Sequence, residues 1–140
     1  MSEADSRATI RNATGADELE LLELLFRAFQ RWPAFEIPVP PLEHLRWKMR
    51  CEPITARRGL VAEIDGRIVA MMLRIVRRVR VKGRDCLARD TVDAAVDPLY
   101  QGRGLYNAIL DYSREGPQEA ELGLDVWYST NPRTDRKSVV

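Results

Sequence analysis

The sequence has a single histidine and only two cysteines among its 140 residues. The cysteines, Cys51 and Cys86, have neither a metal-ligand spacing nor the pattern of a disulfide framework, so we expect buried thiols in a reducing compartment and no metal site. The longest apolar run, residues 68–73, is far too short to cross a bilayer, and the acidic N-terminus is unlike a signal peptide. These absences predict a cytoplasmic protein without a membrane partner.

An excess of charge of one sign is also lacking, because the formal net charge is +1 although 31% of the residues are charged. A chain with this balance has no bulk attraction for nucleic acid, so we expect no nucleic-acid partner. The length of 140 residues is enough for one domain with a substantial core. We expect residues 1–7 to be disordered and residues 8–140 to form that single domain.

Hydrophobic periodicity and turn residues predict a mixture of helices and strands along the chain. A capping box at Thr14 and Asp17 opens the first helix, and Asp65-Gly66 is typical of a hairpin turn between two strands. The expected order is a strand at 8–11, helices at 14–31 and 41–50, strands at 59–64, 67–81 and 85–96, a helix at 104–114, a strand at 122–128 and a helix start at 129–132.

The first helix has many apolar residues, so its buried side is inferred from their spacing. Leu19, Leu22, Phe26 and Phe29 recur at helical intervals and are expected to form the core face. Four neighbours widen that face, namely Leu21, Leu24, Leu25 and Ala28. The lone histidine, His44, lies in the short second helix and is expected on the solvated surface.

The stretch from Val96 to Tyr106 (VDPLYQGRGLY) is the most informative part of the chain. We expect a strand end, a tight turn containing Gly102 and Gly104, and then the first turn of a helix. Glycines let the backbone approach a ligand closely, and a helix N-terminus offers unpaired N–H groups and the positive end of the helix dipole. Such a place suits a phosphate or pyrophosphate. The alternative is a plain strand-to-helix turn in which the glycines only satisfy backbone geometry.

The pattern Gln101-x-x-Gly104-x-Tyr106, after a Val-Asp-Pro strand end, resembles the acetyl-CoA-binding signature of the GCN5-related N-acetyltransferases (GNAT). It departs from that signature at Tyr106, where the family has Gly or Ala, and this side chain would crowd the helix start. No Gly-Lys-Ser/Thr follows, which excludes a P-loop, and the preceding antiparallel meander argues against a dinucleotide-binding βαβ unit. The order of predicted elements over residues 8–135 is also similar to that of the family.

The resemblance implies an α/β fold with a mixed, mostly antiparallel twisted sheet and helices on both faces. It also implies an N-acetyltransferase that moves an acetyl group from acetyl-CoA to a primary amine of a small molecule or peptide, without a metal. In the family the glycine turn binds the pyrophosphate, the preceding strand end binds the pantetheine arm and the thioester, and an asparagine contacts the arm. The matching positions are Gln101, Gly102, Arg103, Gly104, Leu105 and Tyr106 for the turn, Ala94, Ala95 and Val96 for the strand end, and Asn131 for the arm.

Some of these positions have an ordinary structural alternative. Ala94 and Ala95 could be small side chains of a buried strand, and Asn131 could be a simple N-cap. Family members shape the acceptor site near the proline-rich segment 33–41, where aromatic side chains are more often part of the core. The aromatic residues near this segment are Trp32, Phe35 and Trp47.

Acetyl transfer needs a base, because an ammonium group is not nucleophilic. Asp90 lies six residues before Val96, at a place where some family members carry a glutamate base. Since Asp90 is one methylene shorter, it would act through a water molecule; the alternative is a salt-bridged strand residue. Asp93 has the opposite strand parity and is expected on another face unless a bulge intervenes, and Glu63 is a further candidate on a neighbouring strand.

The family normally continues with the rest of the last helix and two closing strands, for which residues 132–140 are too few. We therefore expect either a fragment or a member that departs from the family at its C-terminus. Without these strands an apolar sheet edge would be exposed, which predicts self-association such as a homodimer. Two alternatives to an enzyme remain, a truncated or non-catalytic CoA-binding or partner-binding module and a nucleotide-binding regulatory domain.

Overall fold

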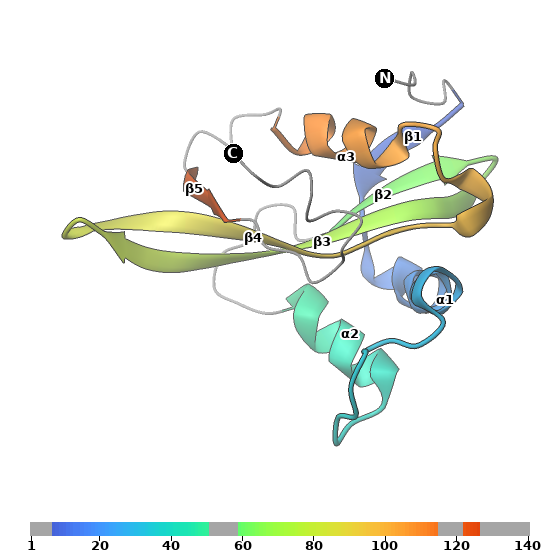
Figure 1. Ribbon diagram of the computed structural model, residues 1–140, viewed down its shortest axis with the longest axis horizontal. Coiled ribbons are helices and arrows are strands. Elements are labelled where there is room, and N and C mark those ends of the chain that lie inside the picture. Colours follow the sequence, from blue (N-terminus) through green and yellow to red (C-terminus); the bar gives the residue numbers. More distant parts are fainter. Residues whose placement is uncertain (1–6, 51–58, 115–121, 127–140) are drawn as a thin grey trace.

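The computed structural model describes residues 7–50, 59–114 and 122–126, and within these ranges the chain forms a five-stranded sheet (Figure 1). The strand order follows the sequence, and every neighbouring pair is antiparallel except the last, which is parallel. The strands are β1 (Thr9–Asn12), β2 (Gly59–Ile64), β3 (Arg67–Val81), β4 (Arg84–Val96) and β5 (Leu122–Val126).

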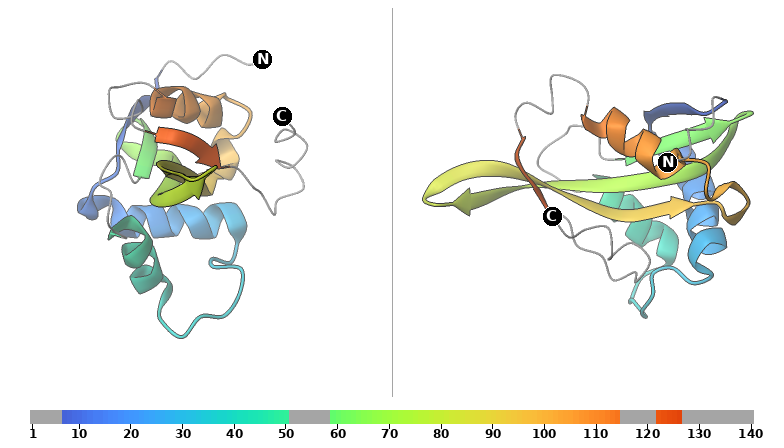
Figure 2. Two further views of the ribbon diagram at one scale, coloured as in Figure 1. Left: turned by 90° about the vertical axis from the view of Figure 1, so that its left-hand side faces the viewer. Right: turned by 45° about the horizontal axis from the view of Figure 1, so that its top comes forward.

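Helices cover both faces of this sheet, as Figure 2 shows. One face carries α1 (Glu18–Phe29) and α2 (Pro41–Arg50), and the other carries α3 (Leu105–Arg114). Each face has its own core, one built around Leu24 and Leu45 and the other around Leu105 and Ile109. This mixed sheet between two helical layers confirms the predicted fold class.

The two hairpins form because each turn has residues that accept a positive φ. Asp65 and Gly66 have φ angles of 52° and 75°, and Lys82 and Gly83 have φ angles of 51° and 78°. Two successive positive φ angles give a turn whose twist matches that of the flanking strands. The β3–β4 hairpin extends beyond the helical layers at one end of the molecule (Figure 1).

The start of α1 is stabilised by the predicted capping box. The Asp17 carboxylate accepts hydrogen bonds from the Thr14 N–H at 2.7 Å and from the Arg11 guanidinium at 2.7 and 2.9 Å. A short 3-10 turn, Gly15–Asp17, precedes the helix, which ends at Phe29 rather than at residue 31. Gln30 follows with a φ of 61°, and the Trp32-Pro33 peptide bond is cis.

The core face predicted for α1 is confirmed for the leucines that widen it and wrong for most of its central residues. Leu21, Leu24 and Leu25 are fully buried, whereas Leu19 is 63% exposed, and Phe26 and Phe29 are also exposed. The helix carries two overlapping apolar stripes, and spacing alone does not rank them. The stripe of leucines is buried because it packs on the sheet and on α2, which leaves Phe26 facing the proline-rich segment.

Several predictions concern parts of the chain outside the described residues. These are the disordered segment 1–7 apart from Arg7, Cys51, the last two residues of the strand predicted at 122–128, the helix start at 129–132 and Asn131. Within the described ranges no helix is long and apolar enough to cross a membrane.

The Asp17 interactions predict a pH-dependent contribution to stability. Arg11 holds the pKa of the Asp17 carboxyl below its usual value, so this group stabilises the folded state above the unfolded pKa and less as the pH falls. We expect Asp17→Asn to lower the free energy of unfolding by about 2 kcal/mol at pH 7. The difference from the wild type should shrink below about pH 4, where the wild-type carboxyl also takes up a proton.

Urea unfolding at several pH values measures this difference. The matched control is Glu23→Gln, which changes an exposed carboxylate of the same helix and should stay within about 0.5 kcal/mol of the wild type. An equal loss in both variants would contradict a special role for Asp17.

Candidate functional site

β4 is interrupted by a bulge three residues before its end. Met71 pairs with Ala95 and Leu73 pairs with Val92, so Asp93 and Ala94 together lie opposite a single residue of β3. Asp93 has a φ of 50°, in the left-handed region. In a regular strand, the side chain of Asp93 would lie on the face opposite to that of Asp90, as its parity predicts. The bulge interrupts this alternation, and the side chain points to the layer of α1 and α2.

Asp93 binds two side chains from that layer. Trp32 Nε1 donates to Oδ1 at 2.9 Å, and Lys48 Nζ donates to Oδ2 at 2.5 Å. The Lys48 ammonium also lies 5.3 Å from the centre of the Trp32 ring. Lys48 was not among the predicted site residues, because no local pattern links a lysine of the second helix to an aspartate 45 residues later.

On the side of β4 away from β3, the backbone of residues 91–96 has no pairing partner among the described residues, and we call it the unpaired edge. The parallel pairing with β5 ends at Asp90 opposite Val126, and no other described residue pairs with β4 on this side. The Asp97 N–H donates to the Val69 carbonyl at 2.8 Å, so the backbone groups of Val96 point away from β3.

A short 3-10 turn, Pro98–Tyr100, connects the unpaired edge to the glycine turn (residues 101–104). Gly102 and Gly104 have φ angles of 79° and 72°, which favour glycine. A Cβ at Gly102 would meet no atom within 4 Å, so the backbone there faces open space. The first α3 hydrogen bond runs from the Ala108 N–H to the Gly104 carbonyl at 3.0 Å, which leaves the preceding N–H groups without a partner in the helix.

Asp97 anchors the start of this turn to α1. Its side chain is 3% exposed, and it accepts the Leu99 N–H at 2.9 Å and the Arg27 Nε–H at 3.1 Å. Arg67 of β3 approaches the same carboxylate at 3.8 Å. A buried carboxylate with these partners holds the strand end, the turn and α1 in one arrangement.

The residues of the predicted turn have different environments. Arg103 is exposed, and its guanidinium carbon lies 4.8 Å from the centre of the Tyr100 ring. The Leu105 side chain is buried in the core, so only its backbone is available to a ligand. Tyr106 packs partly against the same core, and this burial raises the pKa of its hydroxyl. Gln101 is exposed, and its side-chain amide donates to the Val96 carbonyl at 3.4 Å.

The candidate bases do not all lie beside the unpaired edge. Asp90 lies in register with Ile75 of β3 and Val126 of β5, at the last paired residue before the unpaired edge. Glu63 is on β2, which β3 and β4 separate from β5, and it forms an ion pair with Arg11. In the described part of the chain no three His, Cys, Asp or Glu residues gather as a metal site.

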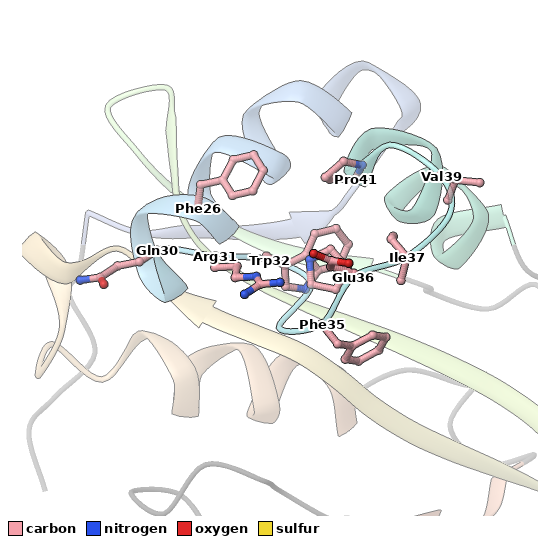
Figure 3. A pocket seen from close by; sticks show the side chains of 10 residues that line it. Phe26, Gln30, Arg31, Trp32, Phe35, Glu36, Ile37, Val39 and Pro41 are labelled. Atoms are coloured by element: carbon pink, nitrogen blue, oxygen red, sulfur yellow. The ribbon is translucent and has the colours of Figure 1, made fainter.

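A hollow of about 400 Å³ lies between the last turn of α1 and the proline-rich segment (Figure 3). Most of its lining is aromatic or aliphatic, and Arg31 and Glu36 are its charged residues. Trp32 links this hollow to the bulge, since it lines the hollow and binds Asp93. The apolar lining residues are Phe26, Trp32, Pro33, Phe35, Ile37, Val39 and Pro41.

His44 is half-buried rather than a fully solvated surface residue. Its ring lies 5.4 Å from that of Trp32 and 5.8 Å from that of Trp47, measured between ring centres. Burial lowers the pKa of His44 most, the Lys48 charge lowers it further, and Asp93 opposes them. The surface prediction failed because α2 packs beside Trp32, a contact that no local sequence pattern indicates.

A sequence profile described as the acetyltransferase (GNAT) domain matches residues 9–137 of the chain. The chain belongs to the GNAT family. No curated protein matches the sequence. Among solved structures, an aminoglycoside acetyltransferase from an uncultured soil metagenomic sample, in complex with sisomicin, has a TM-score of 0.67 and 18% identity, covering 95% of this chain and 84% of that one.

Two further structures have the same fold. A Trypanosoma brucei acetyltransferase has a TM-score of 0.65 and 20% identity, covering 95% of this chain and 92% of that one. A GCN5-related N-acetyltransferase from Kribbella flavida has a TM-score of 0.72 and 16% identity, and the match covers 93% of this chain but only 32% of the Kribbella chain. At such identities the likeness concerns the acetyltransferase fold and carries no information on substrates.

The environment of His44 predicts its titration. Its NMR titration midpoint should lie below 6.5, and Lys48→Met should raise the midpoint without reaching 6.5, because burial is the larger cause. The control is Arg46→Met, which removes a cation of the same helix that pairs with Glu18 instead. A midpoint that moves equally in both variants would contradict the assignment to Lys48.

Proposed function

We propose that this GNAT protein transfers an acetyl group from acetyl-CoA to a primary amine. One observation carries the proposal: the unpaired edge of β4 is followed, after a short 3-10 turn, by a glycine turn that opens α3. An extended ligand arm can pair with such an edge as an additional strand, and its phosphates then reach the free N–H groups at the helix start.

The residues present fit acetyl-CoA. The backbone N–H groups of the turn and of the first turn of α3 would hold the pyrophosphate, and the open space at Gly102 leaves room for it. The Arg103 guanidinium lies at the same turn and adds a positive charge. The proposed cofactor-binding residues are Ala94, Ala95, Val96, Gln101, Gly102, Arg103, Gly104, Leu105, Tyr106 and Asn131.

The acceptor amine would approach from the layer of α1 and α2. The hollow beside Trp32 lies on that side of the sheet and suits the body of a small molecule or the end of a peptide. The amine nitrogen attacks the thioester carbonyl carbon, a C–N bond forms, and the C–S bond breaks to release CoA. The proton lost by the amine passes to Asp90 through a water molecule, which is why Asp90 is the proposed catalytic residue.

The cofactor site can be tested with a substitution in the turn. Gly104→Glu places a side chain and a negative charge where the pyrophosphate would bind. Isothermal titration with acetyl-CoA should show binding by the wild type and a loss of affinity of about tenfold or more in the variant, since each tenfold is about 1.4 kcal/mol.

The matched control is Gly83→Glu in the β3–β4 turn. Gly83 has a φ of 78°, close to the 72° of Gly104, and a Cβ there would meet no atom within 4 Å. The control therefore imposes similar backbone strain away from the site, and it should bind acetyl-CoA like the wild type. No binding by a folded wild type would contradict the proposal, and preferential binding of ATP would favour a nucleotide-binding regulatory domain.

The base can be tested separately. Asp90→Asn should lower kcat by about 10²-fold or more and leave the affinity for acetyl-CoA unchanged. Release of free CoA thiol in the presence of a panel of primary amines measures the rate. Asp85→Asn is the control, because Asp85 is an exposed carboxylate at the far end of the same strand, paired with Arg80. Binding of acetyl-CoA without thiol release for any amine would favour a non-catalytic CoA-binding module.

A further inference from the structure

The left-handed conformation of Asp93 lies inside a strand and not at a hairpin turn. Its φ of 50° falls at the bulge, which lies within the unpaired edge. Aspartate reaches this region more readily than most residues, but the conformation is unfavourable and persists only when its surroundings hold it.

Both partners of Asp93 come from the layer that faces the acceptor side. Trp32 follows α1 and lines the hollow, and Lys48 belongs to α2. The side chains of Lys48 and Asp93 are only 18% and 15% exposed, so the ion pair is largely shielded from water. Such a pair is more sensitive to geometry than an exposed one, because its partners lose hydration that only the contact replaces.

The backbone after Asp93 is the part that would bind the thioester. A change in the backbone angles of Asp93 rotates the peptide group that joins it to Ala94, and this moves the Ala94 N–H relative to the arm. The orientation of the unpaired edge therefore depends on how firmly the Asp93 side chain is held.

From this arrangement we infer that Asp93 is a positioning residue that links the acceptor side to the unpaired edge. The Asp93 clamp, by which we mean its contacts with Trp32 and Lys48, holds the bulge so that the amine and the thioester meet in a fixed geometry. This inference rests on the proposed acetyl transfer for its effect on rate, whereas the clamp itself is a property of the protein without ligand.

Two variants of Asp93 separate the clamp from the backbone angle. Asp93→Gly accepts a φ of 50° freely but makes neither contact, and Asp93→Asn keeps an acceptor for Trp32 but loses the charge that pairs with Lys48. We expect kcat to fall by between about tenfold and a hundredfold in Asp93→Gly, as for a slightly misplaced reactant. The Kd for acetyl-CoA should change by a smaller factor than kcat, because the glycine turn that would hold the pyrophosphate is unchanged. A wild-type kcat in Asp93→Gly would overturn the inference.

The pH profile distinguishes positioning from proton transfer. Asp93→Asn should lower kcat and leave the acid limb of the kcat profile at the same pH, since the clamp moves no proton. Loss or displacement of that limb would overturn the inference and make Asp93 the proton acceptor.

A matched pair on α2 tests the link itself. Lys48→Met removes the cation that binds β4, and Arg46→Met removes one that binds Glu18 of α1 at 2.6 Å. We expect Lys48→Met to reproduce the kcat loss of Asp93→Asn, and the double variant to lose no more, because both act through one contact. Equal kcat losses in Lys48→Met and Arg46→Met, or additive losses in the double variant, would overturn the inference.

Hydrogen exchange tests the clamp even if acetyl transfer fails. The amide groups of Ala95 and Asp97 face β3, and the Asp97 N–H bonds to the Val69 carbonyl at 2.8 Å. In ligand-free protein, Lys48→Met should speed exchange at these amides and leave Val61 in β2 unchanged. Unchanged exchange at Ala95 and Asp97, or faster exchange that extends to Val61, would overturn the local clamp.

Discussion

The bulge in β4 is the constraint on which the arrangement of the candidate site depends. In a regular strand, side chains three residues apart point to opposite faces, yet Val92 and Ala95 both pack on the core beneath α1 and α2. The additional residue opposite Met72 reconciles these positions, and it turns Asp93 toward Trp32 and Lys48. One local change in pairing therefore preserves the core on both sides of the bulge and directs a carboxylate to the layer of α1 and α2.

A second interaction fixes the other end of the unpaired edge. The buried Asp97 carboxylate binds Arg27 of α1 and the Leu99 N–H, while its own N–H bonds to β3. The edge is thus held at its bulge and directly after its last residue by carboxylates that bind residues of the same helical layer.

Most of the fold could be predicted from local signals. The glycine-containing hairpin turns, the capping box and the glycine turn each depend on residues adjacent in the chain, and the strands and helices that they bound lie within a few residues of the expected positions. The central stripe of the buried face of α1 could not be predicted, because its apolar stripes overlap and only tertiary packing selects one. The environment of His44 was missed for the same reason, since Trp32 reaches it from another segment.

For the candidate site, the sequence by itself determined the glycine turn and the family resemblance that the matching domain profile confirms. A positive φ at Gly102 and Gly104 is a local preference, and a helix start follows from neighbouring residues. Only the tertiary structure decided the position of Asp93 and its pairing with Lys48. A register shift depends on how two strands fit their cores, and an ion pair between residues 45 positions apart depends on the packing of layers, neither of which leaves a periodic pattern in the chain.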